Sequence, residues 1–290
     1  MKMTRFFVSI VATSFILLFG TMTANAQRTF DIDLWPQGLP NSNGTDTGMP
    51  FDDSKQNFKP MMRVFLPAAD KADGRAVVCL PGGAYSHLAM EHEGYDWAQF
   101  FNEQGIALVV LKYRMPHAHP EVPISDTREA LRIVRTNAAK WGINPARVGI
   151  MGSSAGGHLA TTIATHSDST TVPAFQILLY PVITFDSRYT HAGSRTNLIG
   201  DNAAPELVSL YSNELQMTRH TPPAIMLLAD DDRTVPSPNS VNYYLALRKQ
   251  GIPASLHIYP SGGHGWGFRP SFKYHEQMLS DLTAWLNTLK

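Results

Sequence analysis

A serine with small neighbours on both sides is the first residue that could do chemistry. Ser154 lies at the centre of GSSAG (residues 152–156), between the apolar run VGIM and a segment of helical periodicity. This is the Gly-x-Ser-x-Gly pattern of a strand-to-helix turn that exposes a nucleophilic hydroxyl, and the turn needs small neighbours so that strand and helix do not collide. A Gly-rich turn that binds a phosphate is the alternative, although the run has neither a Walker lysine nor the Gly-x-Gly-x-x-Gly spacing. The motif alone leaves both interpretations open.

Carboxylates and a histidine in two later loops favour the nucleophile. Asp230, Asp231 and Asp232 follow the apolar run AIMLLA, and His264 lies in the Gly-rich segment GGHGWG after SLHIY. One acid is enough to orient the imidazole and to stabilise its cationic form, and the spacing does not say which of the three does so. Serine, then acid, then histidine is the chain order of α/β-hydrolases. Because loops at the carboxyl ends of parallel strands share one edge of a sheet, we expect these side chains to meet.

Backbone N–H groups that could hold an oxyanion occur in two places. The amide of Ala155 is expected at the start of a helix, where unpaired N–H groups and the helix dipole favour negative charge. Gly82 and Gly83 come directly after the apolar run AVVCL. A Gly-Gly loop at that point of an α/β-hydrolase supplies the second part of the oxyanion hole. A plain tight turn is the alternative for Pro-Gly-Gly.

Apolar runs alternate with helical patterns along the chain. The expected strands are residues 62–66, 76–80, 106–113, 148–151, 175–180, 224–229 and 255–259, and the expected helices are 95–104, 126–141, 155–166, 241–250 and 273–289. Strands this apolar, separated by helices, are expected in a mostly parallel sheet with helices on both faces. We therefore predict one α/β domain over residues 27–290 with little or no cap. The interval 181–223 is long enough for a small lid or for one wall of a cleft.

The clearest helix is expected to begin at Asp126. Asp126 and Glu129 form a plausible capping pair, and apolar residues follow at helical spacing until WGINP ends the helix. Arg114 and Asp126 are both expected to belong to the scaffold and not to the chemistry.

The first residues have the composition of a secretory signal. Lys2 and Arg5 precede an apolar stretch over 6–19, and Ala24-Asn25-Ala26 fits a small-x-small cleavage site. A membrane anchor is the alternative, but the strongly apolar part is shorter than the ~20 residues that a span needs. We predict a signal sequence over 1–26, cleavage after Ala26, and a mature protein outside the membrane that is periplasmic or fully exported.

Composition excludes several other classes. Apolar residues make up 43% and charged residues 17%, the formal net charge is zero, and no long block of one sign occurs, so nothing supports nucleic-acid binding. Cys79 is the single cysteine and lies in an apolar run, where it is expected to be a buried and inert thiol. His117 and His119 lack an obvious third ligand, so no metal site is predicted. Tyr85 and Trp266 could wall the acyl pocket or stack on a sugar ring, and ordinary packing is the alternative.

From about Arg63 to the C-terminus the chain resembles the secreted α/β-hydrolase esterases of the acetylxylan esterase and feruloyl esterase type. The segments that carry this resemblance are PGGAYSHLAMEHEGYDWA, LKYRMP, INPARVGIMGSSAGGHLA, TPPAIMLLADDDRTVP and GGHGWGF. In these relatives the acid precedes x-x-Val-Pro, which implies Asp232. The resemblance also implies Ser154 as nucleophile, His264 as base, and Gly83 with Ala155 as oxyanion donors, with Gly82 as a further donor. The chain departs from the wider esterase pattern at Pro81, where many lipases carry His, and at Ala84, where many carry a third Gly.

The resemblance implies a secreted serine carboxylesterase that removes O-acetyl groups from acetylated xylan or xylo-oligosaccharides without a cofactor. A feruloyl or general short-chain esterase is the alternative within the same chemistry. A serine peptidase and a catalytically silent carbohydrate-binding protein are further hypotheses, and the intact set of serine, acid and histidine argues against the silent protein.

Overall fold

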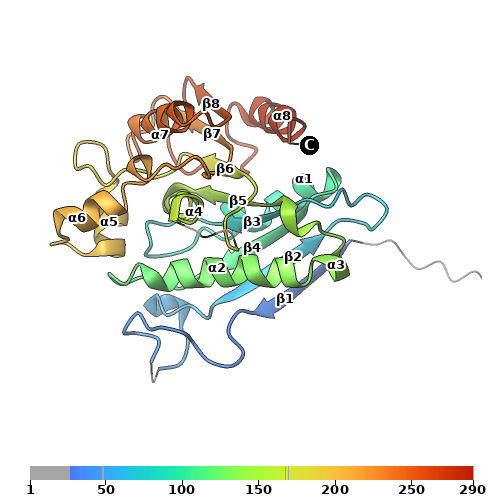
Figure 1. The fold of residues 1–290 in the computed structure, drawn as a ribbon, viewed down its shortest axis with the longest axis horizontal. Coiled ribbons are helices and arrows are strands. Elements are labelled where there is room, and N and C mark those ends of the chain that lie inside the picture. The colour runs from blue at the N-terminus through green and yellow to red at the C-terminus, as the bar shows by residue number, and fades with distance from the viewer. Residues whose placement is uncertain (1–26, 48, 167, 169, 290) are drawn as a thin grey trace, which may run out of the picture.

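An eight-stranded sheet forms the centre of the structure, a computed structural model that describes residues 27–47, 49–166, 168 and 170–289. The predicted signal sequence over 1–26 lies outside the described residues. The strands are β1 (Arg28–Asp33), β2 (Met61–Leu66), β3 (Ala76–Leu80), β4 (Ala107–Lys112), β5 (Val148–Ser153), β6 (Gln176–Leu179), β7 (Ala224–Ala229) and β8 (Ala254–Tyr259). Their order across the sheet is β1-β2-β4-β3-β5-β6-β7-β8 (Figure 1).

The pairing of the strands confirms the predicted α/β-hydrolase fold. The β1–β2 and β2–β4 pairs are antiparallel, and every pair from β4 to β8 is parallel. All seven expected strands occur. The eighth, β1, was not expected because its sequence RTFDID alternates apolar and charged residues at an edge of the sheet, and none of its residues is fully buried.

Helices cover both faces of the sheet, as predicted (Figure 1). The longer helices on one face are α2 (Glu121–Thr136), α4 (Ser154–His166) and α7 (Pro238–Lys249); α1 (Trp97–Glu103) and α8 (His275–Leu286) cover the other. Successive residues of a strand point to opposite faces of the sheet and so supply two cores. Val78 faces the helices α2, α4 and α7, and Val77 and Cys79 face α1 and α8. Burial raises the pKa of the Cys79 thiol, as expected for an inert core residue.

Helix α2 begins at Glu121, so the predicted start and cap at Asp126 are wrong. Asp126 is fully buried in the helix, and its carboxylate accepts hydrogen bonds from the Arg114 side chain, from the Arg114 N–H and from the indole of Trp35. Arg114 also contacts Asp46, and all three charged side chains are inaccessible to solvent. This buried ion-pair cluster ties the lead-in segment to α2, which gives Arg114 and Asp126 the scaffold role expected of them.

The interval 181–223 forms a projection at one side of the molecule (Figure 1). It contains α5 (Ala192–Ile199), α6 (Pro205–Leu210) and the 3-10 turn η4 (Asn213–Leu215). The Asn213 amide donates to the hydroxyls of Thr161 and Thr162 on α4, at 2.9 and 3.0 Å. The Asn197 amide on α5 donates to the carbonyl of Ala84 at 2.8 Å. These contacts fix the interval against the main domain as a wall.

Short helices complete the fold: α3 (Ala138–Trp141), the 3-10 turns η1 (Asp53–Lys55) and η3 (Pro145–Arg147), and the π-helix η2 (Glu91–Tyr95). Within the described part of the chain, no helix combines the length and the apolar character needed to cross a bilayer.

Candidate active site

Ser154 lies at the junction of β5 and α4 in the backbone conformation that an exposed nucleophile requires. Its φ is 53°, in the left-handed region that non-glycine residues rarely adopt. The flanking glycines make this turn possible. A Cβ added at Gly152 would lie 2.2 Å from the carbonyl oxygen of Gly156, and one added at Gly156 would lie 2.0 Å from that of Leu80. Both positions therefore require glycine, as the motif predicts.

The structure brings Ser154, His264 and Asp232 into one hydrogen-bonded chain. His264 Nε2 lies 2.8 Å from Ser154 Oγ, and His264 Nδ1 lies 2.7 Å from Asp232 Oδ2. Asp232 follows β7 and His264 follows β8, so neighbouring strands carry the two loops. The second oxygen of Asp232 accepts the N–H groups of Thr234 and Val235, at 2.9 and 3.0 Å. Those two bonds orient a buried carboxylate so that Oδ2 faces the imidazole.

The three adjacent aspartates have different partners. Asp232 is the one that contacts His264. Asp231 accepts the N–H of Gly263 at 2.8 Å and so holds the loop that carries the histidine. Asp230 is exposed, and its N–H donates to the carbonyl of Tyr259. The three aspartates are the same residue type, so their different hydrogen-bond partners follow from their positions in the loop.

The loop over residues 81–87 passes directly against the serine. A Cβ added at Gly82 would lie 2.9 Å from the Cβ of Ser154, and one added at Gly83, whose φ is 132°, would lie 2.1 Å from the carbonyl oxygen of His87. The backbone of this loop can therefore approach a group bound at Ser154. Within the described residues, the N–H groups of Gly83 and Ala155 donate to no protein acceptor, which leaves them available for an oxyanion.

Gly82 is not available as a further oxyanion donor, so that part of the prediction is wrong. Its N–H donates to Glu93 Oε2 at 2.7 Å, and Glu93 is only 3% exposed. A donor that already serves a buried carboxylate is not free to bind the substrate.

Tyr85 is buried and does not wall a substrate pocket, contrary to expectation. It is 2% exposed, and its hydroxyl lies 2.9 Å from His158 Nδ1. Ala84 and Tyr85 both have positive φ, at 56° and 58°, and this turn of the backbone leads the ring into the core against Tyr113.

Trp266 is also a packing residue, so its predicted stacking on a sugar ring is wrong. Its ring stacks on Phe272 with centroids 4.2 Å apart and meets the edge of Tyr180 at 4.7 Å. The side chain is 4% exposed. Ordinary packing, the alternative in each case, holds for both aromatics.

Three functional candidates are absent from the sequence-based set. Glu93 binds Gly82, the Tyr180 hydroxyl lies 2.8 Å from Glu93, and the Tyr180 ring packs against His264 with centroids 4.7 Å apart. His191 caps α5 by accepting the N–H of Ser194 at Nδ1. Glu93 lies inside a segment that carries the family resemblance, EHEGYDWA, but nothing in the sequence marks it as buried.

His191 interacts electrostatically with two residues of the hydrogen-bonded triad formed by Ser154, Asp232 and His264. Burial, followed by the charge of His264, lowers the pKa of His191, while Asp232 acts in the opposite direction. A neutral ring that accepts the Ser194 N–H at Nδ1 carries its proton on Nε2. His191 can therefore offer one N–H donor from the wall formed by the interval 181–223.

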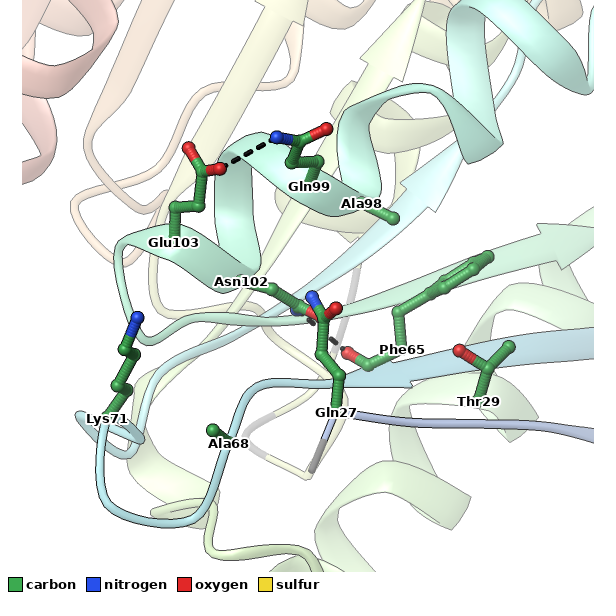
Figure 2. A pocket seen from close by; sticks show the side chains of 9 residues that line it. All are labelled: Gln27, Thr29, Phe65, Ala68, Lys71, Ala98, Gln99, Asn102 and Glu103. Atoms are coloured by element: carbon green, nitrogen blue, oxygen red, sulfur yellow. Dashed lines mark hydrogen bonds between the residues drawn. The ribbon is translucent and has the colours of Figure 1, made fainter. Parts of the chain in front are cut away.

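A separate pocket of about 420 Å³ lies between β1, β2 and α1 (Figure 2). Figure 2 shows amide side chains, Lys71 and Glu103 around it, with the Asn102 amide bonded to the Phe65 carbonyl. None of its lining residues belongs to the triad, and β1 and β2 are at the opposite edge of the sheet from β7 and β8. Among the described residues, no group of three His, Cys, Asp or Glu side chains has the geometry of a metal site, and this includes His117 and His119.

Comparison with solved structures gives the same architecture. The acetyl ester-xyloside bifunctional hydrolase from Caldicellulosiruptor lactoaceticus superposes with a TM-score of 0.77 at 33% sequence identity, covering 90% of this chain and 96% of that one. Nearly the whole of that structure therefore aligns with this chain.

Curated relatives are similar in sequence over most of this chain. An acetylxylan esterase from Xylanibacter ruminicola is 42% identical over 281 residues, which are 96% of this chain and 54% of the relative. Endo-1,4-beta-xylanase B from Butyrivibrio fibrisolvens is 34% identical over 229 residues, 73% of this chain and 35% of the relative. The chain spans about half or less of the length of these two relatives. Residues 62–247 match the BD-FAE family, and the chain therefore belongs to the BD-FAE family of α/β-hydrolases.

Proposed function

We propose that this protein is a serine carboxylesterase that removes O-acetyl groups from acetylated xylan or xylo-oligosaccharides. The observation that carries the chemistry is the continuous hydrogen-bonded chain from Ser154 through His264 to Asp232. The substrate class is supported by the similarity to an acetylxylan esterase and to an acetyl ester-xyloside hydrolase.

The geometry supports acyl transfer in two steps. His264 Nε2 takes the proton of Ser154 as Oγ attacks the acetyl carbonyl, and the N–H groups of Gly83 and Ala155 stabilise the tetrahedral oxyanion. The C–O bond to the sugar then breaks, and His264 returns its proton to the leaving alcohol. Water, deprotonated by the same imidazole, then attacks the carbonyl of the acetyl-serine. The bond to Oγ breaks, acetate leaves, and His264 returns the proton to Ser154. Asp232 keeps the proton of the neutral imidazole on Nδ1 throughout, which leaves Nε2 free to act as the base.

Activity on defined esters tests the proposal. We expect the purified protein to release acetate from acetylated xylo-oligosaccharides, and Ser154→Ala to lower kcat by at least about 10⁴-fold because the covalent route is lost. Ser240→Ala, which removes a buried hydroxyl on α7, serves as the matched control and keeps full activity. An organophosphonate should label the wild type and the control but not Ser154→Ala.

Two results would contradict the proposal. Undiminished ester cleavage by Ser154→Ala would remove the proposed nucleophile. Cleavage of feruloylated or aryl esters without release of acetate from xylo-oligosaccharides would replace the proposed substrate by those of a feruloyl or general short-chain esterase.

We also infer that residues 1–26 direct export and that residues 27–290 form the mature domain. The positive start, the apolar stretch and the small residues before Gln27 support this inference. N-terminal sequencing of the protein recovered outside the cytoplasm should begin at Gln27. Recovery of the uncleaved chain from the cytoplasm would contradict it.

A further inference from the structure

Glu93 is a buried carboxylate with no cation within salt-bridge distance among the lysines and arginines of the described residues. It is 3% exposed, and the nearest basic atom is Nε2 of His92, at 4.0 Å. Burial of a carboxylate is costly unless hydrogen bonds satisfy it. Its two oxygens are satisfied by different parts of the fold, and both parts belong to the active site.

One oxygen holds the loop over residues 81–87. Glu93 Oε2 accepts the N–H of Gly82 at 2.7 Å. The carbonyl of Gly82 is held as well, because it accepts the N–H of Ala89 at 3.0 Å. Both backbone polar groups of Gly82 are thus held. The Gly82 carbonyl belongs to the same planar peptide unit as the N–H of Gly83, so holding it also orients this proposed oxyanion donor.

The other oxygen holds the loop over residues 260–268, which carries His264. Glu93 Oε1 accepts the hydroxyl of Tyr180 at 2.8 Å, and that hydroxyl in turn accepts the N–H of Gly267 at 2.7 Å. The Tyr180 ring lies against the imidazole of His264. Burial and then the negative charge of Glu93 raise the pKa of Tyr180 well above its usual value, so its hydroxyl keeps the proton that it donates.

The backbone next to Glu93 adds a second contact to the 260–268 loop. Glu93 belongs to the π-helix η2, and π-helical turns are frequent at functional sites. The carbonyl of the preceding residue, His92, accepts the N–H of Phe268 at 2.7 Å. One short helix therefore contacts the 81–87 loop and the 260–268 loop at the same time.

Resting on the proposed function, we propose that Glu93 is a positioning residue that fixes the oxyanion donor of Gly83 relative to the imidazole of His264. Glu93 touches no reacting atom; it acts through Gly82 on one side and through Tyr180 and Gly267 on the other. The transition state needs the oxyanion donor and the base in place together, so loss of Glu93 lowers turnover more than substrate binding.

The test compares Glu93→Gln, Tyr180→Phe and the double variant with the wild type. We expect Glu93→Gln to lower kcat about tenfold to a hundredfold with KM changed less than about twofold, since displacing a catalytic group by ~1 Å can cost about a hundredfold. Tyr180→Phe removes the hydroxyl bonds to Glu93 and to Gly267 but leaves the bond between Glu93 and Gly82, so we expect a smaller fall in kcat. The double variant should be no worse than Glu93→Gln, because Tyr180 acts through the carboxylate. The affinity for an aryl trifluoromethyl ketone, which adds to Ser154 and places its oxyanion at the same donors, should fall in parallel with kcat/KM.

Tyr243→Phe is the matched control. Tyr243 is fully buried on α7, and its hydroxyl donates to Gln176 at 2.7 Å, outside the active site. We expect this variant to lose thermal stability to a similar extent as Tyr180→Phe while kcat stays unchanged.

Four results would overturn the proposal: a folded Glu93→Gln protein with wild-type kcat, a change confined to KM, a double variant whose loss equals the product of the single losses, or an equal fall in kcat for Tyr243→Phe. If Glu93→Gln does not fold, the contrast between Tyr180→Phe and Tyr243→Phe decides. An inactive wild type would instead contradict the proposed function, so the two failures are distinguishable.

Discussion

Asp232 differs from its two neighbours only in its place in the loop after β7. All three carboxylates have the same chemistry, yet two backbone N–H groups hold Asp232 so that its free oxygen meets His264. Asp231 instead anchors the N–H of Gly263, one residue before the histidine. The hydrogen-bond partner of each acid is therefore set by its place in the turn.

Replacing the three aspartates one at a time by asparagine should give three different results. Asp232→Asn should lower kcat by about 10³–10⁴-fold, because an amide that donates to Nδ1 stabilises the wrong tautomer of the histidine. Asp231→Asn retains an acceptor for Gly263 and should lose less than about tenfold, as expected for a positioning hydrogen bond. Asp230→Asn is the control with wild-type kcat. Equal losses for Asp230→Asn and Asp232→Asn in steady-state assays would contradict this assignment.

A site residue can be predicted from the sequence when the residues next to it in the chain form a recognisable pattern. Ser154 and His264 are flanked by glycines and follow apolar runs, so both could be predicted. Glu93 could not be, because its partners Gly82 and Tyr180 are 11 and 87 residues away. Tyr85 and Trp266 were misplaced for the opposite reason. Both lie close to the site in sequence, but turns of the backbone direct their side chains into the core.

The sequence predicts strands and helices correctly where the pattern of apolar residues alone determines the element. The runs that became β3, β5 and β7 are buried on both faces, so they are continuously apolar. Helix α2 begins five residues before the predicted start at Asp126. Asp126 is a residue type that often caps helices, but here the buried side chain of Arg114 binds its carboxylate inside the helix. Pro120 and Pro123 lie at the true start, where proline is tolerated. A tertiary ion pair thus overrides a local helix signal.

The junction of β5 and α4 should tolerate no side chain at residue 156. Gly156→Ala places a Cβ 2.0 Å from the Leu80 carbonyl oxygen, so we expect a loss of about 1–3 kcal/mol in the free energy of unfolding, as for other overpacked sites. Activity should fall as well, because the strand β3 that precedes the 81–87 loop must move. Denaturant unfolding and kcat/KM measure the two effects.

Gly251→Ala is the control for this variant. Gly251 has a φ of 74° with nothing within 4 Å of an added Cβ, so the change costs only backbone strain of about 1–2 kcal/mol. It should leave kcat/KM unchanged. A Gly156→Ala protein as active as Gly251→Ala would contradict the proposed tight approach of α4 to β3.

His158 joins three regions that are far apart in sequence. On α4, it lies between Tyr85, which follows β3, and the carbonyl of Tyr211 in the interval 181–223, each at 2.9 Å. Its ring stacks on Phe185 with centroids 4.3 Å apart. Because a carbonyl can only accept, Nε2 carries the proton and Nδ1 accepts the Tyr85 hydroxyl. The ring is therefore neutral and satisfied at both nitrogens, and burial lowers its pKa to about 4.

This neutral histidine should make the stability of the whole molecule depend on pH. The unfolded chain protonates a histidine near pH 6.5 and the folded chain protonates His158 near pH 4, so between these values the unfolded state binds more protons. The free energy of unfolding should rise with pH over this window, and the contribution of His158, about 3 kcal/mol, should be lost as the pH falls from 6.5 to 4. His158→Gln keeps an amide donor for Tyr211 and an oxygen acceptor for Tyr85, so it should reduce this slope in denaturant unfolding.

Other groups contribute to the pH dependence as well. Burial also lowers the pKa values of His92, His166 and His191, so part of the slope should remain in His158→Gln. Asp168 and Asp186 have pKa values of about 2 and act only below about pH 4. His220→Gln, at an exposed position, is the control for the substitution of a histidine by glutamine. Equal slopes for the wild type and His158→Gln would show that His158 is not the source of the acid sensitivity.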